Sequence, residues 1–257
     1  MGISYNGSHY DGWQSQSSGK TVQDQLERAL ARFMAVDVVH TVCAGRTDAG
    51  VHGLNQVVHF DTQLDRPSHA WVRGTNSFLP PHMAVQWAQP VLPTFHARAS
   101  AVGRRYVYML LESPVRPSVD HGRVGWVFRP LNLLSMQSAA SYLIGEHDFT
   151  SFRASACQAN SPVKDMRRID ITRRGNYWRF DFEASAFLHH MIRNIMGCLV
   201  AIGAGNRPPS WMKDVLVAKS RDAAAPTFAP DGLYFLGPIY DATWSIPDGT
   251  PVSGWLP

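Results

Sequence analysis

Residues 44–52 concentrate side chains that could perform chemistry. Arg46, Thr47 and Asp48 place a cation, a hydroxyl and a carboxylate next to one another, with a glycine on either side of the group. Glycine permits tight turns and close approach of a ligand, arginine can grip a phosphate through two parallel hydrogen bonds, and aspartate can act as a nucleophile or a base. The alternative is a surface turn in which Arg46 and Asp48 form an ion pair. The residues alone leave both interpretations open.

Regular elements should hold this segment in place. β-Branched residues at 38–43 predict a strand before it, and alternating residues at 56–62 predict a strand after it. A helix is expected over 21–34, with Thr21 as its cap and Asp24 completing a capping box. Catalytic residues often lie on loops between such elements. Further helices are expected at 68–78, 133–144, 187–202 and 211–219, and strands at 83–88, 104–112, 164–173, 177–184 and 233–240.

The order of these elements predicts two α+β halves. Strand, helix, strand, strand, helix, strand occurs once before residue 90, and a similar order with insertions follows residue 103. Each half is expected to be an antiparallel sheet with helices on one face. We expect the N-terminal half at 1–102, the C-terminal half at 103–245 and a tail at 246–257 that is rich in proline and glycine.

Composition narrows the class of protein. The formal net charge of +4 and the isoelectric point of about 9.1 are compatible with a polyanionic partner, although many basic proteins bind no nucleic acid. Cys43, Cys157 and Cys198 are far apart and odd in number, which argues against a disulfide framework or a structural zinc site and suits a reducing cytoplasm. With neither a signal peptide nor a long apolar run, we expect a cytoplasmic protein that does not span a membrane.

Seven motifs occur in order along the chain. They are YDGWQ at 10–14, GRTDAGVH at 45–52, FHAR at 95–98, RRYVY at 104–108, DFTSFR at 148–153, AFLHHMIRN at 186–194 and GLY at 232–234. Together they resemble the TruA-type tRNA pseudouridine synthases over nearly the whole chain, from about residue 2 to residue 240. The resemblance implies two ferredoxin-like (RRM-like) halves that share one continuous antiparallel sheet. It also implies a homodimer that isomerises uridines 38 to 40 in the anticodon stem-loop of tRNA.

The resemblance further implies roles for five residues. Asp48 matches the essential aspartate, and Arg46 matches an arginine that holds RNA and helps to displace the target base. Tyr106 matches the tyrosine that stacks on the target uracil. Arg193 matches the arginine that pairs with the catalytic carboxylate, and Leu233 matches an apolar residue of the base pocket. Because the isomerisation is redox-neutral, we expect no cofactor, and the sequence contains no phosphate-binding loop or dinucleotide fingerprint.

Two other functions are compatible with the sequence. One is a non-catalytic RNA-binding module on the same fold, which would have no chemical need for Asp48. The other is an aspartate-based hydrolase, which would need a second carboxylate or a histidine at motif spacing. Survival of the activity in EDTA would separate a metal-dependent reaction from the isomerisation.

Adjacent histidines and paired arginines have less specific interpretations. His189 and His190 are expected on a helix, where neighbours point about 100° apart, so we expect no metal there but one buried histidine and one that faces RNA. In a strand, only one arginine of an adjacent pair can face a given surface. The pairs 104–105, 167–168 and 173–174 are therefore either solvated or partly in contact with phosphate.

Overall fold

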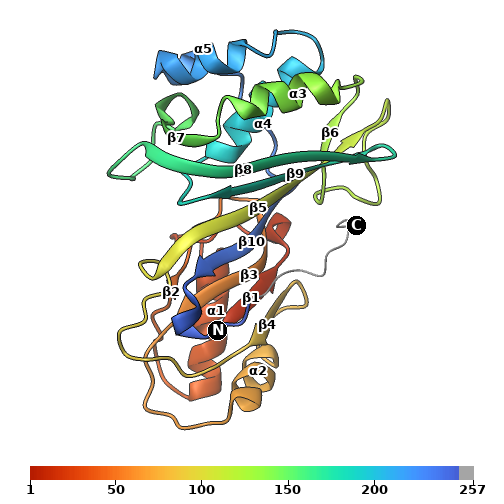
Figure 1. Ribbon diagram of the computed structural model, residues 1–257. Coiled ribbons are helices and arrows are strands. Elements are labelled where there is room, and N and C mark those ends of the chain that lie inside the picture. Colours follow the sequence, from red (N-terminus) through yellow and green to blue (C-terminus); the bar gives the residue numbers. More distant parts are fainter. Residues whose placement is uncertain (249–257) are drawn as a thin grey trace. The chain divides into compact units, whose positions relative to one another are not determined.

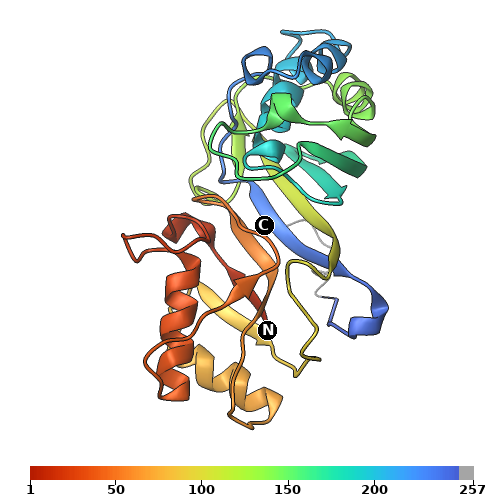
Figure 2. The same ribbon diagram turned by 90° about the vertical axis from the view of Figure 1, so that its left-hand side faces the viewer.

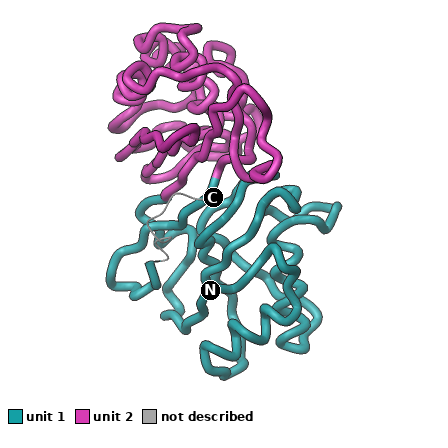
Figure 3. The backbone as a smooth tube through the Cα atoms, turned by 90° about the vertical axis from the view of Figure 1, so that its right-hand side faces the viewer, with its two compact units in different colours: residues 1–104, 234–254 teal, residues 105–233, 255–257 magenta. Residues whose placement is uncertain are grey.

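The computed structural model describes residues 1–248, which form two compact units (Figures 1 and 3). Unit 1 comprises residues 1–104 and 234–248, and unit 2 comprises residues 105–233. The α+β class expected from the order of elements is confirmed. The division differs from the expected halves, because the last strand belongs to unit 1. The expected tail lies outside the described residues from position 249 onward.

Unit 1 is built on strands in the order β4-β1-β3-β10, with β2 also paired to β3. Their bounds are β1 Gly2–Tyr5, β2 Val42–Cys43, β3 His52–His59, β4 Met83–Trp87 and β10 Leu233–Tyr240. β1 is antiparallel to both β3 and β4. β10 pairs with β3 in parallel, with Tyr234 opposite His52 and Phe235 opposite Gly53. This pairing is the physical reason that the C-terminal strand belongs to unit 1.

Helices cover one face of unit 1, as expected. Helix α1 (Val22–Met34) begins at the Thr21 cap, whose side chain accepts a hydrogen bond from the Asp24 N–H at 3.2 Å. Helix α2 (Ser68–Asn76) lies beside it (Figure 2). Both helices share a core with the strands, made of Val22, Leu26, Leu30, Trp71, Ile3, Tyr5, Val58, Met83 and Val85. The neighbouring Val57 points to the opposite face, where it packs with Phe95 and Ala97.

Unit 2 has the strand order β5-β9-β8-β7, with β6 paired to β5 in parallel. Its elements are β5 Ala101–Glu112, β6 Gly125–Val127, α3 Leu133–Ser141, β7 Gly145–Asp148, β8 Val163–Arg174, β9 Tyr177–Ala184, α4 Met191–Gly203 and α5 Trp211–Ala218. The three helices lie on one side of β8 and β9 (Figure 1). The expected hairpin at Gly175 is confirmed, with a φ of +59° at the turn.

The hydrogen-bonded strand order places the ten strands in one sheet, and β5 has its first residues in unit 1 and the rest in unit 2. The parallel pairings of β10 with β3 and of β6 with β5 make this sheet mixed rather than purely antiparallel. Within residues 1–248, none of the helices is long and apolar enough to cross a membrane.

Candidate active site

The loop between β2 and β3 carries Asp48 and is fixed on both sides of that residue. Thr47 is buried, and its hydroxyl lies 2.9 Å from the hydroxyl of Tyr5. The Thr47 carbonyl accepts a hydrogen bond from the Trp13 N–H at 3.0 Å. The Asp48 carbonyl accepts one from the Val51 N–H at 3.1 Å, which closes a turn. The backbone that carries the carboxylate is therefore held by the first strand, the YDGWQ segment and its own turn.

Two glycines allow neighbouring segments to pack directly against this loop. Gly12 has a φ of +90°, and a Cβ there would lie 3.0 Å from the Thr47 carbonyl oxygen and 3.2 Å from the Asp48 carbonyl carbon. A Cβ on Gly7 would lie 2.0 Å from the Val51 carbonyl oxygen. Because any larger residue would push the loop outward, both positions need glycine to keep Asp48 where it is.

Exposure alternates along the loop. Arg46 is exposed, Thr47 is buried and Asp48 is half-buried. The buried Thr47 thus anchors the loop between two charged neighbours that both keep access to solvent. A simple surface turn would not need the anchors of Thr47. The Arg46–Asp48 ion pair of that interpretation stays untested.

His52 is a structural residue that sequence reasoning did not single out. Its side chain is 2% exposed, and its Nδ1 accepts a hydrogen bond from the Gly7 N–H at 3.0 Å. The ring stacks on Tyr234, with centroids 4.4 Å apart. An accepting Nδ1 requires the other ring nitrogen to carry the proton when the imidazole is neutral. The histidine of GRTDAGVH therefore joins the loop to β10, and the aromatic pair at positions 52 and 234 was the available signal.

In unit 2, Tyr106 and Leu233 occupy apolar positions. Tyr106 is 8% exposed on β5, and its ring meets the ring of Phe187 edge to face, with centroids 5.1 Å apart. Leu233 is 5% exposed at the start of β10. The preceding Gly232 accepts a hydrogen bond from the Met109 N–H at 2.8 Å, and a Cβ on Gly232 would lie 2.1 Å from the Met109 carbonyl oxygen. The GLY motif thus sets the position of Leu233 through close packing.

Arg193 lies in the first turn of α4, where a helix carries partial positive charge. Its Nε donates a hydrogen bond to the Phe228 carbonyl at 2.8 Å, and its own carbonyl accepts one from the Phe228 N–H at 3.1 Å. This turn contains no acidic residue, and the side chain of the cap residue His190 forms no capping hydrogen bond. A cation at this end opposes the helix dipole but adds to its attraction for an anion. The arrangement suits the binding of a carboxylate or a phosphate.

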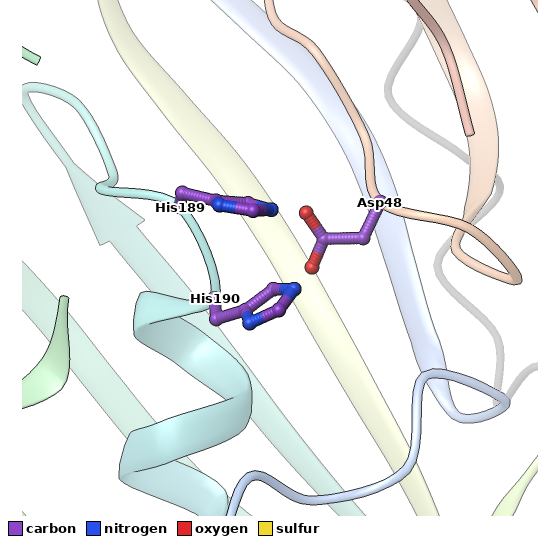
Figure 4. A group of neighbouring side chains, drawn as sticks. All are labelled: Asp48, His189 and His190. Atoms are coloured by element: carbon purple, nitrogen blue, oxygen red, sulfur yellow. The ribbon is translucent and has the colours of Figure 1, made fainter. Parts of the chain in front are cut away.

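His189 and His190 do not lie on a helix, contrary to expectation. Helix α4 begins at Met191, and His190 has a left-handed φ of +62°. Figure 4 shows the side chains of His189 and His190, which extend from the segment just before α4, and that of Asp48, which extends from its loop in unit 1. The two rings lie 4.0 Å apart between centroids, so the argument from helical spacing does not apply. His189 is exposed and His190 is half-buried, so neither is the buried histidine that we expected.

The paired arginines mostly bind within the protein. Arg104 donates hydrogen bonds to the carbonyls of Arg98 at 2.8 Å and Ala44 at 3.2 Å, so it anchors the chain just before the Asp48 loop. Arg173 pairs with the largely buried Glu112 at 2.9 Å. Arg168 forms an ion pair with Asp170. The hydrogen bonds of Arg104 to backbone carbonyls were not predicted from the sequence, because residue types do not identify such partners.

Burial raises the pKa of the two tyrosines beside the loop. It raises the pKa of Tyr5 well above its ordinary value, although hydrogen bonds with Thr47 and Gln56 act in the opposite direction. Burial also raises the pKa of Tyr10 to about 12. Both phenols are therefore neutral at physiological pH, and the anchor of Thr47 is a hydrogen bond between neutral groups.

The five expected site residues divide between the two units. Arg46 and Asp48 lie on one loop of unit 1, and Tyr106, Arg193 and Leu233 belong to unit 2. That Asp48, Tyr106 and Arg193 act on one bound nucleotide stays a prediction. Each of the five lies on, or directly after, a strand, a helix start or an anchored loop.

Comparison with known proteins gives a consistent result. A family model described as tRNA pseudouridine synthase matches residues 1–98 and 139–241. Four of the five site residues fall in these segments, whereas Tyr106 lies between them. A protein of Acidovorax ebreus named tRNA pseudouridine synthase A is 66% identical, with 100% of this chain and 98% of that protein covered. One of the same name from Paracidovorax citrulli is 65% identical, with 100% and 99% covered.

Among solved structures, a Cbf5-Nop10-Gar1 complex matches at a TM-score of 0.34 and 12% identity, over 88% of this chain and 60% of that chain. A similarity this low supports no argument about fold or function.

Proposed function

The chain belongs to the tRNA pseudouridine synthase family, and on this premise we propose that Asp48 is the catalytic carboxylate for the conversion of uridine to pseudouridine in tRNA. In this reaction the N1–C1′ bond breaks, the uracil turns, and C5 bonds to C1′. The C5 proton is lost and N1 regains a proton, so no electrons leave. Positioning and a charged group in a dry pocket are what the protein must supply.

One observation carries the assignment of Asp48. It is a half-buried carboxylate whose backbone is held by hydrogen bonds at Thr47 and at its own carbonyl. A carboxylate that is fixed before the substrate arrives need not reorganise during the reaction. Burial alone would raise the pKa of such a group, whereas a nearby cation favours its charged form. We assign that cation to Arg193, whose Nε is already held by the Phe228 carbonyl.

The remaining residues have roles in binding the substrate. We assign Arg46, which is exposed, to the RNA backbone and to displacement of the target base. A base must leave its stack before its C5 can react, and we assign Tyr106 to stack on it, with Leu233 as an apolar wall. Tyr106 is also a candidate relay for the C5 proton. Asp48 acts by attack at C1′, by attack at C6 or by removal of a sugar proton.

Finer features follow from the family resemblance and belong to the same proposal. We propose that the target uridines are positions 38 to 40 of the anticodon stem-loop. We also propose that the protein acts in the cytoplasm as a homodimer, with each tRNA bound across both subunits. Mapping of pseudouridine in isolated tRNA tests the target positions. The mass of the protein with and without tRNA tests the homodimer and its binding of tRNA.

The deciding experiment measures tritium release from tRNA that carries [5-³H]uridine, in the presence of EDTA. The wild-type protein is compared with Asp48→Asn, which keeps the shape of the side chain and removes its charge. Asp37→Asn, in an exposed loop, is the matched control. We expect release by the wild type and by the control, and a loss of at least about 1,000-fold in Asp48→Asn, with tRNA binding retained.

Other results would change the assignment. Full activity in Asp48→Asn would place the chemistry on another residue. Binding of tRNA without release by the wild-type protein would favour the non-catalytic RNA-binding module. Loss of release in EDTA alone would indicate a metal-dependent reaction.

A further inference from the structure

Residues 225–229 form a strap that lies along α4 without regular secondary structure. A Cβ on Gly197 would lie 2.3 Å from the Pro226 carbonyl oxygen, so helix and strap are in direct contact. The Ala225 N–H donates to the Cys198 Sγ at 3.3 Å. Beyond the helix, the Ala229 carbonyl accepts a hydrogen bond from the Tyr108 hydroxyl at 2.8 Å. The strap therefore connects α4 with strand β5.

Two consecutive residues of the strap form hydrogen bonds with two consecutive residues at the start of α4. Phe228 exchanges two hydrogen bonds with Arg193, one of which holds the guanidinium through Nε. The preceding Thr227 donates its hydroxyl hydrogen to the Asn194 Oδ1 at 2.7 Å. The carbonyl that orients Arg193 thus follows directly after the residue that is anchored by Asn194.

Asn194 is fully buried and its hydrogen bonds have only one consistent direction. Arg221 donates from Nη2 to the Thr227 hydroxyl oxygen at 3.1 Å. Because arginine is only a donor, the Thr227 hydroxyl must give its own hydrogen to the Asn194 Oδ1. The Asn194 Nδ2 then donates to the Phe152 carbonyl at 2.8 Å. If Asn194 lost one of these partners, a buried polar atom would be left without a hydrogen bond, which would destabilise the folded protein.

We infer that Asn194 and Thr227 are positioning residues, which hold the Phe228 carbonyl where it orients the guanidinium of Arg193. Neither is assigned to touch the substrate. The inference rests on the proposed role of Arg193 as the partner of the catalytic carboxylate. A charged group in an active site has to be held within about 0.5 Å of its working position, and a displacement of about 1 Å can lower the rate about 100-fold.

Thr227→Val tests this with Thr227→Ser as the matched control, because serine keeps the hydroxyl and valine keeps the shape. We expect Thr227→Val to lower kcat about tenfold or more, with KM for tRNA within about twofold. Serine should restore kcat. A purely structural role would lower the melting temperature but leave kcat unchanged at a temperature where the protein is folded, and that result would overturn the inference. If Thr227→Val does not fold, Thr227→Ala removes the same hydroxyl donor to Asn194 from a smaller side chain and should lower kcat in the same way.

A double-mutant cycle with Arg193→Lys separates this inference from the proposed function. If Thr227 acts through Arg193, Thr227→Val should lower single-turnover rates in the wild type but add little to Arg193→Lys. An equal loss in both backgrounds would show that Thr227 acts by another route and would overturn the inference. Unchanged turnover in Arg193→Lys would instead contradict the role of Arg193, and with it the basis of the inference. Loss in Arg193→Lys without loss in Thr227→Val would overturn the inference alone.

Discussion

Replacement of Thr47 by valine tests whether the anchor beneath Asp48 serves both stability and turnover. The change removes the hydroxyl that lies 2.9 Å from the Tyr5 hydroxyl and keeps the volume of the side chain nearly constant. Tyr5 is 4% exposed, so its hydroxyl would lose a partner in a site with little access to water. Such a loss costs about 1–3 kcal/mol.

The expected cost falls in the lower part of that range. Gln56 also forms a hydrogen bond with the Tyr5 hydroxyl, which would keep one partner after the change. We therefore expect the free energy of unfolding to fall by about 1–2 kcal/mol. For a chain of this size, that corresponds to a decrease in melting temperature of about 2–8 °C.

Turnover should fall as well, because Asp48 directly follows the residue that loses its anchor. A shift of about 1 Å at a reacting group can lower a rate about 100-fold. The Trp13 hydrogen bond to the Thr47 carbonyl remains and limits the movement. We expect kcat for tritium release to fall about 10- to 100-fold at a temperature where the variant is folded.

Two companion variants make the experiment decisive. Thr47→Ser keeps the hydroxyl and should resemble the wild type in both measurements. In Tyr5→Phe/Thr47→Val both hydroxyls are absent, so the double variant should be less destabilised than the sum of the single changes. Wild-type behaviour of Thr47→Val would refute the reasoning. If Thr47→Ser were as impaired as the valine variant, packing of the methyl group and not the hydrogen bond would be responsible.

Three further predictions concern other parts of the chain. Burial lowers the pKa of His59 below its ordinary value of 6.5, with a smaller effect from the charge of His96. As the pH falls below 6.5, the unfolded chain therefore binds a proton at His59 before the folded protein does, and the free energy of unfolding should decrease. Urea midpoints at pH 7.5 and 5.5 check this, and an equal pH dependence in His59→Gln would contradict it. Burial tends to raise the pKa of Cys157, but hydrogen bonds from the Ala159 and His189 backbone outweigh it and lower the pKa, whereas burial raises the pKa of Cys43 and Cys198. A maleimide at pH 7 should therefore modify the native protein once, and mass spectrometry should find no modification in Cys157→Ser. Gly12→Ala forces a side chain into a φ of +90° and against the Asp48 loop. It should lower the free energy of unfolding by at least about 1–2 kcal/mol and lower kcat. At the control position Gly205, a Cβ meets no atom within 4 Å and the only strain is the φ of +77°, so Gly205→Ala should leave kcat unchanged.

Elements with strong local signals were predicted well. The helix expected over 21–34 is α1, because the capping box and the apolar stripe both act within the segment. The hairpin around Gly175 is present for the same reason, since its turn residues and the alternation of β9 are local features.

Elements that depend on distant partners were predicted less well. The strand expected over 38–43 is reduced to Val42–Cys43, and Val38 is 65% exposed, because pairing with β3 extends only over the last two residues. β3 starts at His52 rather than at Gln56, since β10 pairs with its first residues from the other end of the chain. α4 starts four residues later than expected, because the apolar Phe187 and Leu188 continue the helical pattern while His190 breaks the backbone with a positive φ.

The candidate site shows the same limit. The motif residues and Asp48 could be found in the sequence, since their types and order are informative. The anchors could not, because Tyr5, Trp13 and Arg104 act through single hydrogen bonds to distant backbone or hydroxyl groups. The position of Arg193 depends on the Phe228 carbonyl, and a backbone carbonyl leaves no mark in the residue type.

The parallel pairing of β10 with β3 also has a consequence for biosynthesis. When residues 1–104 have left the ribosome, β3 has β1 and β2 as neighbours but still lacks β10, and unit 2 must be made first. At about 5–20 residues per second, residues 105–233 take roughly 6–26 s to synthesise. During that time the nascent chain presents an unpaired strand edge, which is a template for pairing with other chains. Unit 2, whose residues are contiguous, can fold while unit 1 waits, so the segment that carries Asp48 would be completed last.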